Sequence, residues 1–217
     1  MENLNLVMTE NGLNLLGITD AVKLVEIDHP LAKRVADLYL HKIDIEFSNS
    51  CLDAINRTED QIIREALWRS AVIHFFKCFG DGIRFLLMSD QIYKGLPKEA
   101  NESFKYFKLL RNKHIAHDEN PYNQCLSCAA INDGGKDYHV EKIVCISSTS
   151  STLDASHWSS LKALTDRALE WITLEFDISC EKLTKILEKE TYEQITSKPS
   201  PHVTAPTARE IGDRRKI

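Results

Sequence analysis

Residues 109–118 of the chain read Leu-Leu-Arg-Asn-Lys-His-Ile-Ala-His-Asp and bring an arginine, an amide and two histidines close together. Side chains at helical spacing lead into this stretch and continue through it: Phe104, Phe107, Leu110, His114 and His117. Spacings of three and four place side chains on one face of an α-helix. The pattern therefore predicts a helix from about Pro97 to His117, with both imidazoles on its apolar, partner-facing stripe.

The arginine and the second histidine do not share a face in that helix. Arg111 and His117 are six positions apart, so at about 100° per residue they point about 120° away from each other. One explanation is that the helix frays near His117, because Asn120-Pro121 ends it. The other is that a second chain supplies the facing set across a two-fold axis. We favour the second explanation, with fraying contributing to it.

An arginine, a polar residue, a short gap and a histidine at a helix end resemble the signature motif of the HEPN superfamily. That motif is an arginine, four to six residues, and a histidine, and Arg111-Asn112 with His117 fits it with five intervening residues. The run Leu-Arg-Asn-Lys-x-x-Ala-His-Asp is most similar to the abortive-infection branch, and the resemblance covers roughly residues 25–190. It implies a helical bundle that acts as a homodimeric, metal-independent endoribonuclease, in a toxin or phage-defence role. The implied products carry a 2′,3′-cyclic phosphate or 3′-phosphate and a 5′-hydroxyl.

The chemistry of such a reaction suits these residue types. A metal-free ribonuclease needs groups that move the protons of the 2′-hydroxyl and the leaving 5′-oxygen, and a cation against the phosphorane charge. Histidine, with an unperturbed pKa of about 6.5, suits the first task, and the planar arginine fork suits the second. We expect His117 to be the acid/base, Arg111 to bind phosphate and Asn112 to orient them, without metal or cofactor. His114 and Asp118 are supporting candidates.

One regulatory route of the family is not expected here. Members modified by a paired nucleotidyltransferase antitoxin carry a tyrosine two positions after the histidine, where this chain has Glu119, and Tyr122 is out of register. An antitoxin or defence-system partner of another type, or activation by phage infection, stays open.

The charge distribution favours a local RNA-binding surface. The net charge of the chain is −5, but residues 94–117 hold six cations and two anions, a local charge of +4 that leaves −9 elsewhere. A basic helix on an acidic body can guide a phosphate backbone to one groove, which makes Lys105, Lys108 and Lys113 candidate RNA contacts. The alternative is that Lys105 and Lys108 only keep the outer face of the helix in contact with water.

The remaining sequence predicts an all-α, HEPN-like bundle of four to five helices with a β-hairpin insertion after the motif helix. We expect an N-terminal arm or hairpin over residues 1–20, one helical domain over 21–195 and a disordered tail over 196–217. The hairpin is predicted at about residues 122–149, around the turn Asp133-Gly134-Gly135. A long first helix is expected to start at Pro30, and a last helix of some thirty residues to be capped by Asp154 or Ser156.

Three finer features are predicted between and before these helices. Thr19-Asp20 is expected to cap a brief helix through Val25, and Thr58 to cap the second long helix. After the interruption at Gly80-Asp81-Gly82, the helical pattern is expected to resume from Ile83 to Leu87.

The sequence also bears on membrane insertion, on secretion, on metal sites and on two rival functions. No apolar run reaches the roughly 20 residues that span a bilayer, and the N-terminus has no signal-peptide pattern, so a cytoplasmic protein without membrane contact is expected. Six cysteines are scattered as thiols, and Cys125-x-x-Cys128 is only half of a four-ligand zinc site. Two rival functions are a non-catalytic dimerisation or binding module, and a metal hydrolase that uses His114, His117 and Asp118.

Overall fold

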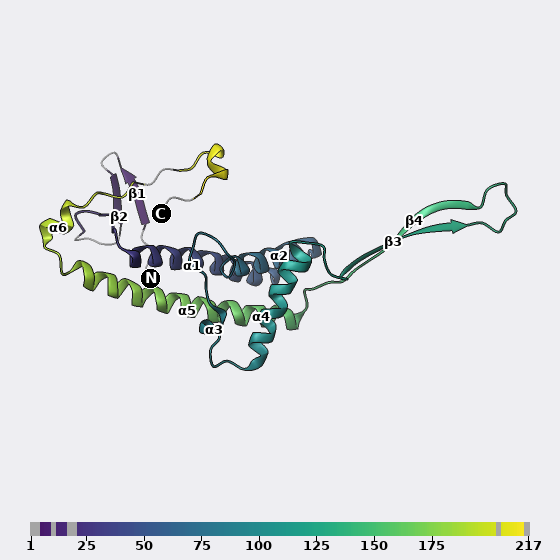
Figure 1. Ribbon diagram of the computed structural model, residues 1–217, viewed down its shortest axis with the longest axis horizontal. Coiled ribbons are helices and arrows are strands. Elements are labelled where there is room, and N and C mark those ends of the chain that lie inside the picture. The colour runs from purple at the N-terminus through teal and green to yellow at the C-terminus, as the bar shows by residue number, and fades with distance from the viewer. Residues whose placement is uncertain (1–4, 10–11, 17–20, 203–204, 215–217) are drawn as a thin grey trace. The chain divides into compact units, whose positions relative to one another are not determined.

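The structure is a computed structural model that describes residues 5–9, 12–16, 21–202 and 205–214. Its helices and strands in chain order are β1 (Asn5–Thr9), β2 (Gly12–Leu16), α1 (Pro30–Ile55), α2 (Gln61–Lys77), α3 (Ser89–Ile92), α4 (Lys98–Leu110), η1 (Arg111–Ile115), β3 (Asn123–Ile131), β4 (Val140–Thr149), α5 (Ala155–Leu187), α6 (Tyr192–Ser197) and η2 (Ala208–Gly212) (Figure 1). The predicted mostly helical fold with a hairpin after the motif helix is confirmed at this level.

The contacts of the chain group into two compact units, where the sequence predicted one domain. One unit combines Asp44–Gly80 with Leu87–Ala168, and the other combines Asp81–Leu86 with Leu169–Ile217 and the described part of Met1–Ile43. The long helices α1 and α5 supply residues to both units. The motif helix, the hairpin and α2 all belong to the first of these units, which we call the motif unit.

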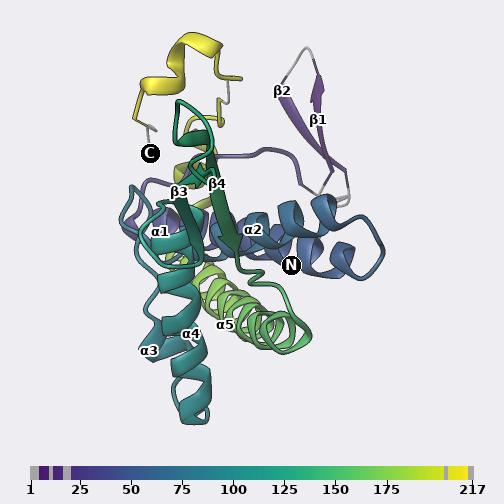
Figure 2. The same cartoon turned by 90° about the vertical axis from the view of Figure 1, so that its right-hand side faces the viewer.

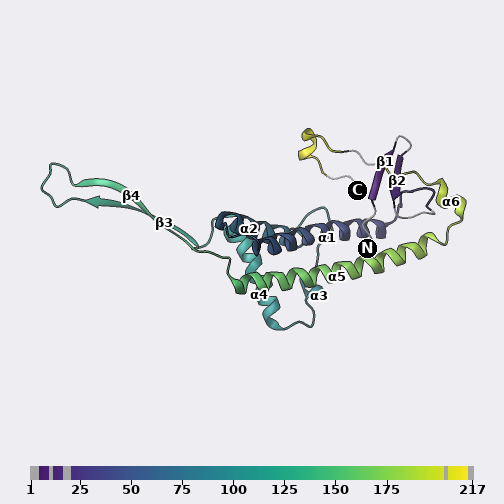
Figure 3. The same cartoon turned by 180° about the vertical axis from the view of Figure 1, so that it is seen from behind.

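Within each unit α1 and α5 are neighbouring, antiparallel helices (Figures 1 and 3). In the motif unit, Thr165 donates a hydrogen bond to the Asn49 side chain over 2.5 Å, and the Trp158 indole donates to the Leu52 carbonyl over 2.9 Å. In the other unit, Arg34 pairs with Glu175 over 3.1 Å. The predicted start of α1 at Pro30 and the length of α5 are confirmed.

Aromatic side chains fill the core of the motif unit. Phe76 of α2 and Phe104 of α4 have ring centroids 5.1 Å apart, and Trp68 contacts Phe107 at 5.8 Å. Phe107 and Trp68 are fully buried. Because burying an aromatic ring contributes about 1.5–3 kcal/mol, this cluster fixes α4 on α2 and thereby holds the residues that follow α4.

Three predictions about helix boundaries are wrong. Asp60, not Thr58, caps α2, because its carboxylate accepts from the Ile62 and Ile63 amides over 2.8 and 3.1 Å. Residues 83–87 after the glycine pair are irregular rather than helical, and residues 21–25 are not helical either. Thr19-Asp20, the expected cap of that brief helix, lies outside the described residues.

The two hairpins pair only within themselves (Figure 2). β1 and β2 form the hairpin expected in the N-terminal arm. In β3 and β4, Leu126 lies opposite Ile146 and Cys128 opposite Val144. Every residue of these two strands is exposed except the half-buried Cys128.

The C-terminal segment begins with ordered contacts. Thr191 caps α6 with a reciprocal capping box, and the Glu26 amide donates to the Pro199 carbonyl over 2.8 Å. Lys23 donates to two carbonyls of the same segment, those of Thr196 and Lys198. Residues 208–212 form a short exposed 3₁₀ turn. In the described part of the chain, no helix is long and apolar enough to cross a membrane.

Candidate functional site

The motif lies on a π-helical turn at the end of α4. The α-helix ends at Leu110, and the Ala116 amide then donates to the Arg111 carbonyl over 2.9 Å, a spacing of five residues instead of four. A π turn adds one residue to a helical turn, so the residues after it rotate by about 100° relative to a regular helix. The prediction of a regular helix to His117 is therefore wrong in its last turn.

This change separates the environments of the two histidines. His114 is buried, with an exposed fraction of 6%, and its ring meets that of Tyr122 edge to face at 5.5 Å. His117 is exposed and lies beyond the last helical residue. The expectation that both imidazoles lie on the buried stripe is confirmed for His114 and wrong for His117. Fraying before Asn120-Pro121, the lesser of the two explanations, is present.

Arg111 and Asn112 form a pair on the π turn. The Arg111 Nη1 donates to the Asn112 Oδ1 over 2.8 Å, and both side chains are half-buried. This contact restricts the guanidinium while its remaining donors stay available. Arg111 and His117 share no hydrogen bond, ion pair or ring contact, so the structure brings Arg111 and Asn112 together but not His117 with them.

An ion pair and hydrogen bonds among residues 113–123 fix the loop between the π turn and β3. Lys113 forms an ion pair with Glu119, and this lysine lowers the pKa of the Glu119 carboxyl. The Glu119 amide also donates to the Lys113 carbonyl over 2.9 Å. Asp118 accepts from the amide group of Asn123, the first residue of β3, over 3.3 Å. Asp118 and Lys113 thus shape the loop between the motif and the hairpin.

The predicted RNA contacts differ in how their charges are matched. Lys105 and Lys108 are exposed on α4, and neither takes part in an ion pair with any residue that the structure describes. The charge of Lys113 is matched by Glu119. The available positive charge at this end of α4 therefore comes from Lys105, Lys108 and Arg111.

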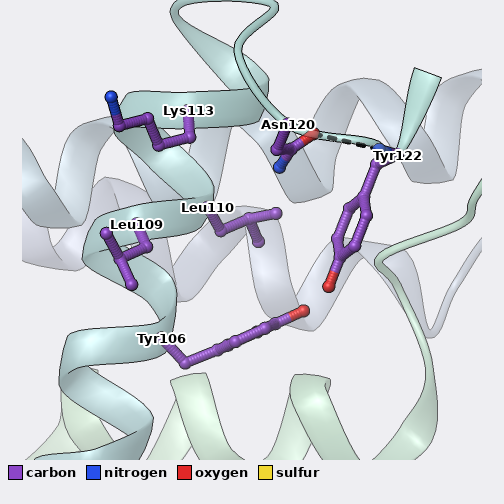
Figure 4. A pocket seen from close by; sticks show the side chains of 6 residues that line it. All are labelled: Tyr106, Leu109, Leu110, Lys113, Asn120 and Tyr122. Atoms are coloured by element: carbon purple, nitrogen blue, oxygen red, sulfur yellow. Dashed lines mark hydrogen bonds between the residues drawn. The ribbon is translucent and has the colours of Figure 1, made fainter. Parts of the chain in front are cut away.

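A pocket of about 280 Å³, which we call the tyrosine pocket, opens beside the motif (Figure 4). It is lined by Tyr106, Leu109, Leu110, Lys113, Asn120 and Tyr122. Sequence reasoning did not identify this pocket. Tyr106, Leu110 and Lys113 are spaced four and three apart, so the helical repeat marks their common face, but only the loop after α4 closes it.

Tyr106 of the pocket is held by a ring stack and is partly buried. Tyr106 stacks on His157 of α5, with ring centroids 4.7 Å apart and planes within 8°. Burial raises the pKa of Tyr106 to about 12, and the neighbouring Tyr122 hydroxyl adds to this rise. The Tyr106 phenol is therefore protonated, and able to donate a hydrogen bond, throughout the physiological pH range.

The described residues contain no group of three histidine, cysteine or acidic side chains that could hold a metal ion. His114, His117 and Asp118, the set considered for a metal hydrolase, are not brought together. Cys125, Cys128 and the other four cysteines are free thiols.

Comparison of the chain with protein-family models, with curated proteins and with solved structures finds no match.

Proposed function

We propose that this chain is a metal-independent endoribonuclease of the HEPN type that acts as a homodimer in a toxin or phage-defence role, on a HEPN-like arrangement of its helices. The observation that carries the proposal is the π turn, which presents the Arg111–Asn112 pair at the cationic end of α4, a few residues before the exposed His117. Arginine held by a neighbouring amide is a phosphate-binding arrangement, since its fork keeps further N–H donors free.

His117 is the proposed acid/base. It is exposed on the loop, and its imidazole makes no hydrogen bond with the described residues, so it is free to exchange protons with an RNA substrate. A free imidazole close to neutral pH can take the 2′-hydroxyl proton or protonate the leaving 5′-oxygen. Since Arg111 and His117 do not meet within one chain, the proposed site needs the second copy of a homodimer to complete both roles.

A non-catalytic binding module is the second candidate. The separation of Arg111 from His117 within one chain favours this candidate. The burial of His114 also favours it, because it gives this residue of the motif a packing role. In that case the basic end of α4 would bind an RNA or protein partner without cleaving it.

RNA cleavage by the purified protein in the presence of EDTA tests the proposal. Wild-type protein should cleave single-stranded RNA and leave 5′-hydroxyl ends, while Arg111→Ala and His117→Ala should each lose at least about a hundredfold in rate, as expected for removal of a catalytic acid/base or charge-stabilising group. End-group labelling by polynucleotide kinase, with and without prior phosphatase, identifies the 5′ ends.

Matched variants control for charge and folding. Arg57 lies exposed in the turn after α1 and His139 lies exposed in the hairpin loop, so Arg57→Ala and His139→Ala remove the same residue types elsewhere in the motif unit. These two variants should cleave like the wild type. Equal rates for all four variants would refute the assigned site, and a folded wild type that is inert on RNA would favour the binding module.

A further inference from the structure

The tyrosine pocket lies at the end of α4 that carries the proposed phosphate-binding turn. Leu110 precedes Arg111, and Lys113 both lines the pocket and belongs to the π turn. The Lys113 stem borders the pocket while its ammonium group points away from it (Figure 4), toward its ion pair with Glu119. The pocket and the π turn therefore share Lys113 and belong to the same end of α4.

The pocket has the shape and surface that suit one planar ring. Tyr106 is stacked on His157 through one face, and its other face borders the pocket opposite Leu110 (Figure 4). Its volume of about 280 Å³ is just below the ~300–1,000 Å³ of typical ligand pockets. Aromatic and aliphatic side chains such as those that line this pocket are surfaces on which proteins stack unpaired bases.

The polar groups at the rim of the pocket can bind a base edge. Asn120 accepts the Tyr122 amide through Oδ1 over 3.2 Å, and its Nδ2 makes no hydrogen bond with the described residues. In Figure 4 this Nδ2 lies on the pocket side, while the hydroxyls of Tyr106 and Tyr122 lie next to each other, where their hydrogen bond contributes to the raised pKa of Tyr106. Every nucleobase carries acceptor atoms on its edges that an amide donor such as the Asn120 Nδ2 can bind.

We infer that the tyrosine pocket holds one unpaired nucleobase of the RNA substrate, stacked on Tyr106 and bound at its edge by the Asn120 Nδ2. This inference rests on the proposed RNA-directed function. It makes the substrate class single-stranded RNA, because a paired base does not expose its face. The cations Lys105, Lys108 and Arg111 of α4 and the π turn would bind phosphates of the same strand.

The test uses short single-stranded RNA in which every ribose is 2′-O-methylated, so that no 2′-hydroxyl is available for cleavage. A central 2-aminopurine reports stacking by loss of its fluorescence, and a matched oligonucleotide carries an abasic residue at the same position. Wild-type protein should quench the fluorescence and bind the abasic oligonucleotide about tenfold or more weakly, the range that one stacked base contributes.

Asn120→Asp is the key variant, because the carboxylate still accepts the Tyr122 amide but replaces the Nδ2 donor. It should bind the base-containing oligonucleotide about as weakly as the abasic one, without quenching. Asn101→Asp adds the same charge at an exposed position of α4 and should bind like the wild type. Arg111→Ala should weaken both oligonucleotides while the difference between them persists.

The outcomes separate this inference from the proposed cleavage. Base discrimination by a protein that does not cleave RNA would support the pocket and refute the nuclease. Cleavage that depends on Arg111 and His117, with equal affinity for base-containing and abasic RNA, would refute the pocket alone. Equal losses in Asn120→Asp and Asn101→Asp, or no measurable RNA binding by the wild type, would also overturn the inference.

Discussion

His114 is an imidazole that is 94% buried without a hydrogen bond to either ring nitrogen. A buried polar group without a partner costs about 1–3 kcal/mol, so this side chain stabilises the motif by packing rather than by polarity. Its contact with Tyr122 links the π turn to the first residues after the loop. We therefore assign His114 to the support of the site and leave the reaction to the exposed His117.

This assignment predicts opposite effects for two substitutions of His114. His114→Leu removes the unpaired nitrogens at similar volume, so the free energy of unfolding should stay equal or rise by up to about 1 kcal/mol. His114→Ala leaves a cavity and should lower the free energy of unfolding by about 2 kcal/mol. Urea unfolding measures both values. RNA cleavage lost in a folded His114→Leu protein would instead place His114 in the reaction.

The residue scale also shows what the motif pattern could not predict. The repeat through Phe104, Phe107 and Leu110 identified the buried face of α4. The same repeat misplaced His117, because one i to i+5 hydrogen bond rotates every later side chain, and no residue type in Arg111–Ile115 demands that bond. Lys113 was predicted as an RNA contact, but Glu119 six positions later matches its charge.

At the scale of elements, the helix ends were harder to predict than the helices. Thr58-Glu59-Asp60 offers two good capping residues, and sequence alone does not choose between them. In the structure, the Thr58 hydroxyl accepts from the Asp60 amide over 3.3 Å, while Asp60 caps α2. Thr58 thus orders the turn that precedes the cap.

The observed cap predicts a difference in stability between neighbouring substitutions. Asp60→Ala removes the acceptor of two helix amides and should lower the free energy of unfolding by about 1 kcal/mol. Thr58→Ala should cost less, since it removes only the bond to the Asp60 amide, and Glu59→Ala serves as the matched exposed control. Thermal and urea unfolding measure these effects, and a larger loss for Thr58→Ala than for Asp60→Ala would restore Thr58 as the cap.

Local sequence predicted where the strands of the second hairpin lie in the chain, but not whether other residues cover them. The turn Asp133-Gly134-Gly135 and the β-branched residues after it located the hairpin, and Gly134 adopts φ +87°, a conformation that L-residues rarely adopt. Large aliphatic side chains such as Leu126 and Ile146 are nevertheless more than 60% exposed. Alternation along a strand shows which residues share a face, but not whether anything in the chain covers that face.

Across the whole molecule, an acidic chain carries a basic segment at residues 94–117. The chain carries a net charge of −5, so long-range electrostatics oppose RNA binding except at a concentrated basic surface. Lys98 and Lys113 lie in the basic segment but pair with Glu102 and Glu119. Among the residues that the structure describes, Lys105, Lys108 and Arg111 remain as the cations of α4 and the π turn for phosphates to neutralise.

This count predicts the salt dependence of RNA binding. Each phosphate contact to a single strand contributes about −0.7 to the slope of log affinity against log salt, so three cations per chain give about −2. The double variant Lys105→Ala/Lys108→Ala should reduce the magnitude of the slope to about 0.7. Titrations of 2′-O-methylated RNA between about 50 mM and 200 mM salt measure it.

Lys98→Ala is the matched control for that titration, because its ammonium group already pairs with Glu102 over 2.8 Å. It should leave the slope of the wild type unchanged. If the double variant keeps the wild-type slope, then Lys105 and Lys108 only solvate the outer face of α4. If Lys98→Ala reduces the slope as much as the double variant does, then RNA recognises the general charge of the segment. Lys105 and Lys108 lie on α4 and Arg111 begins the π turn, so a selective effect of these cations supports one defined path for the RNA backbone.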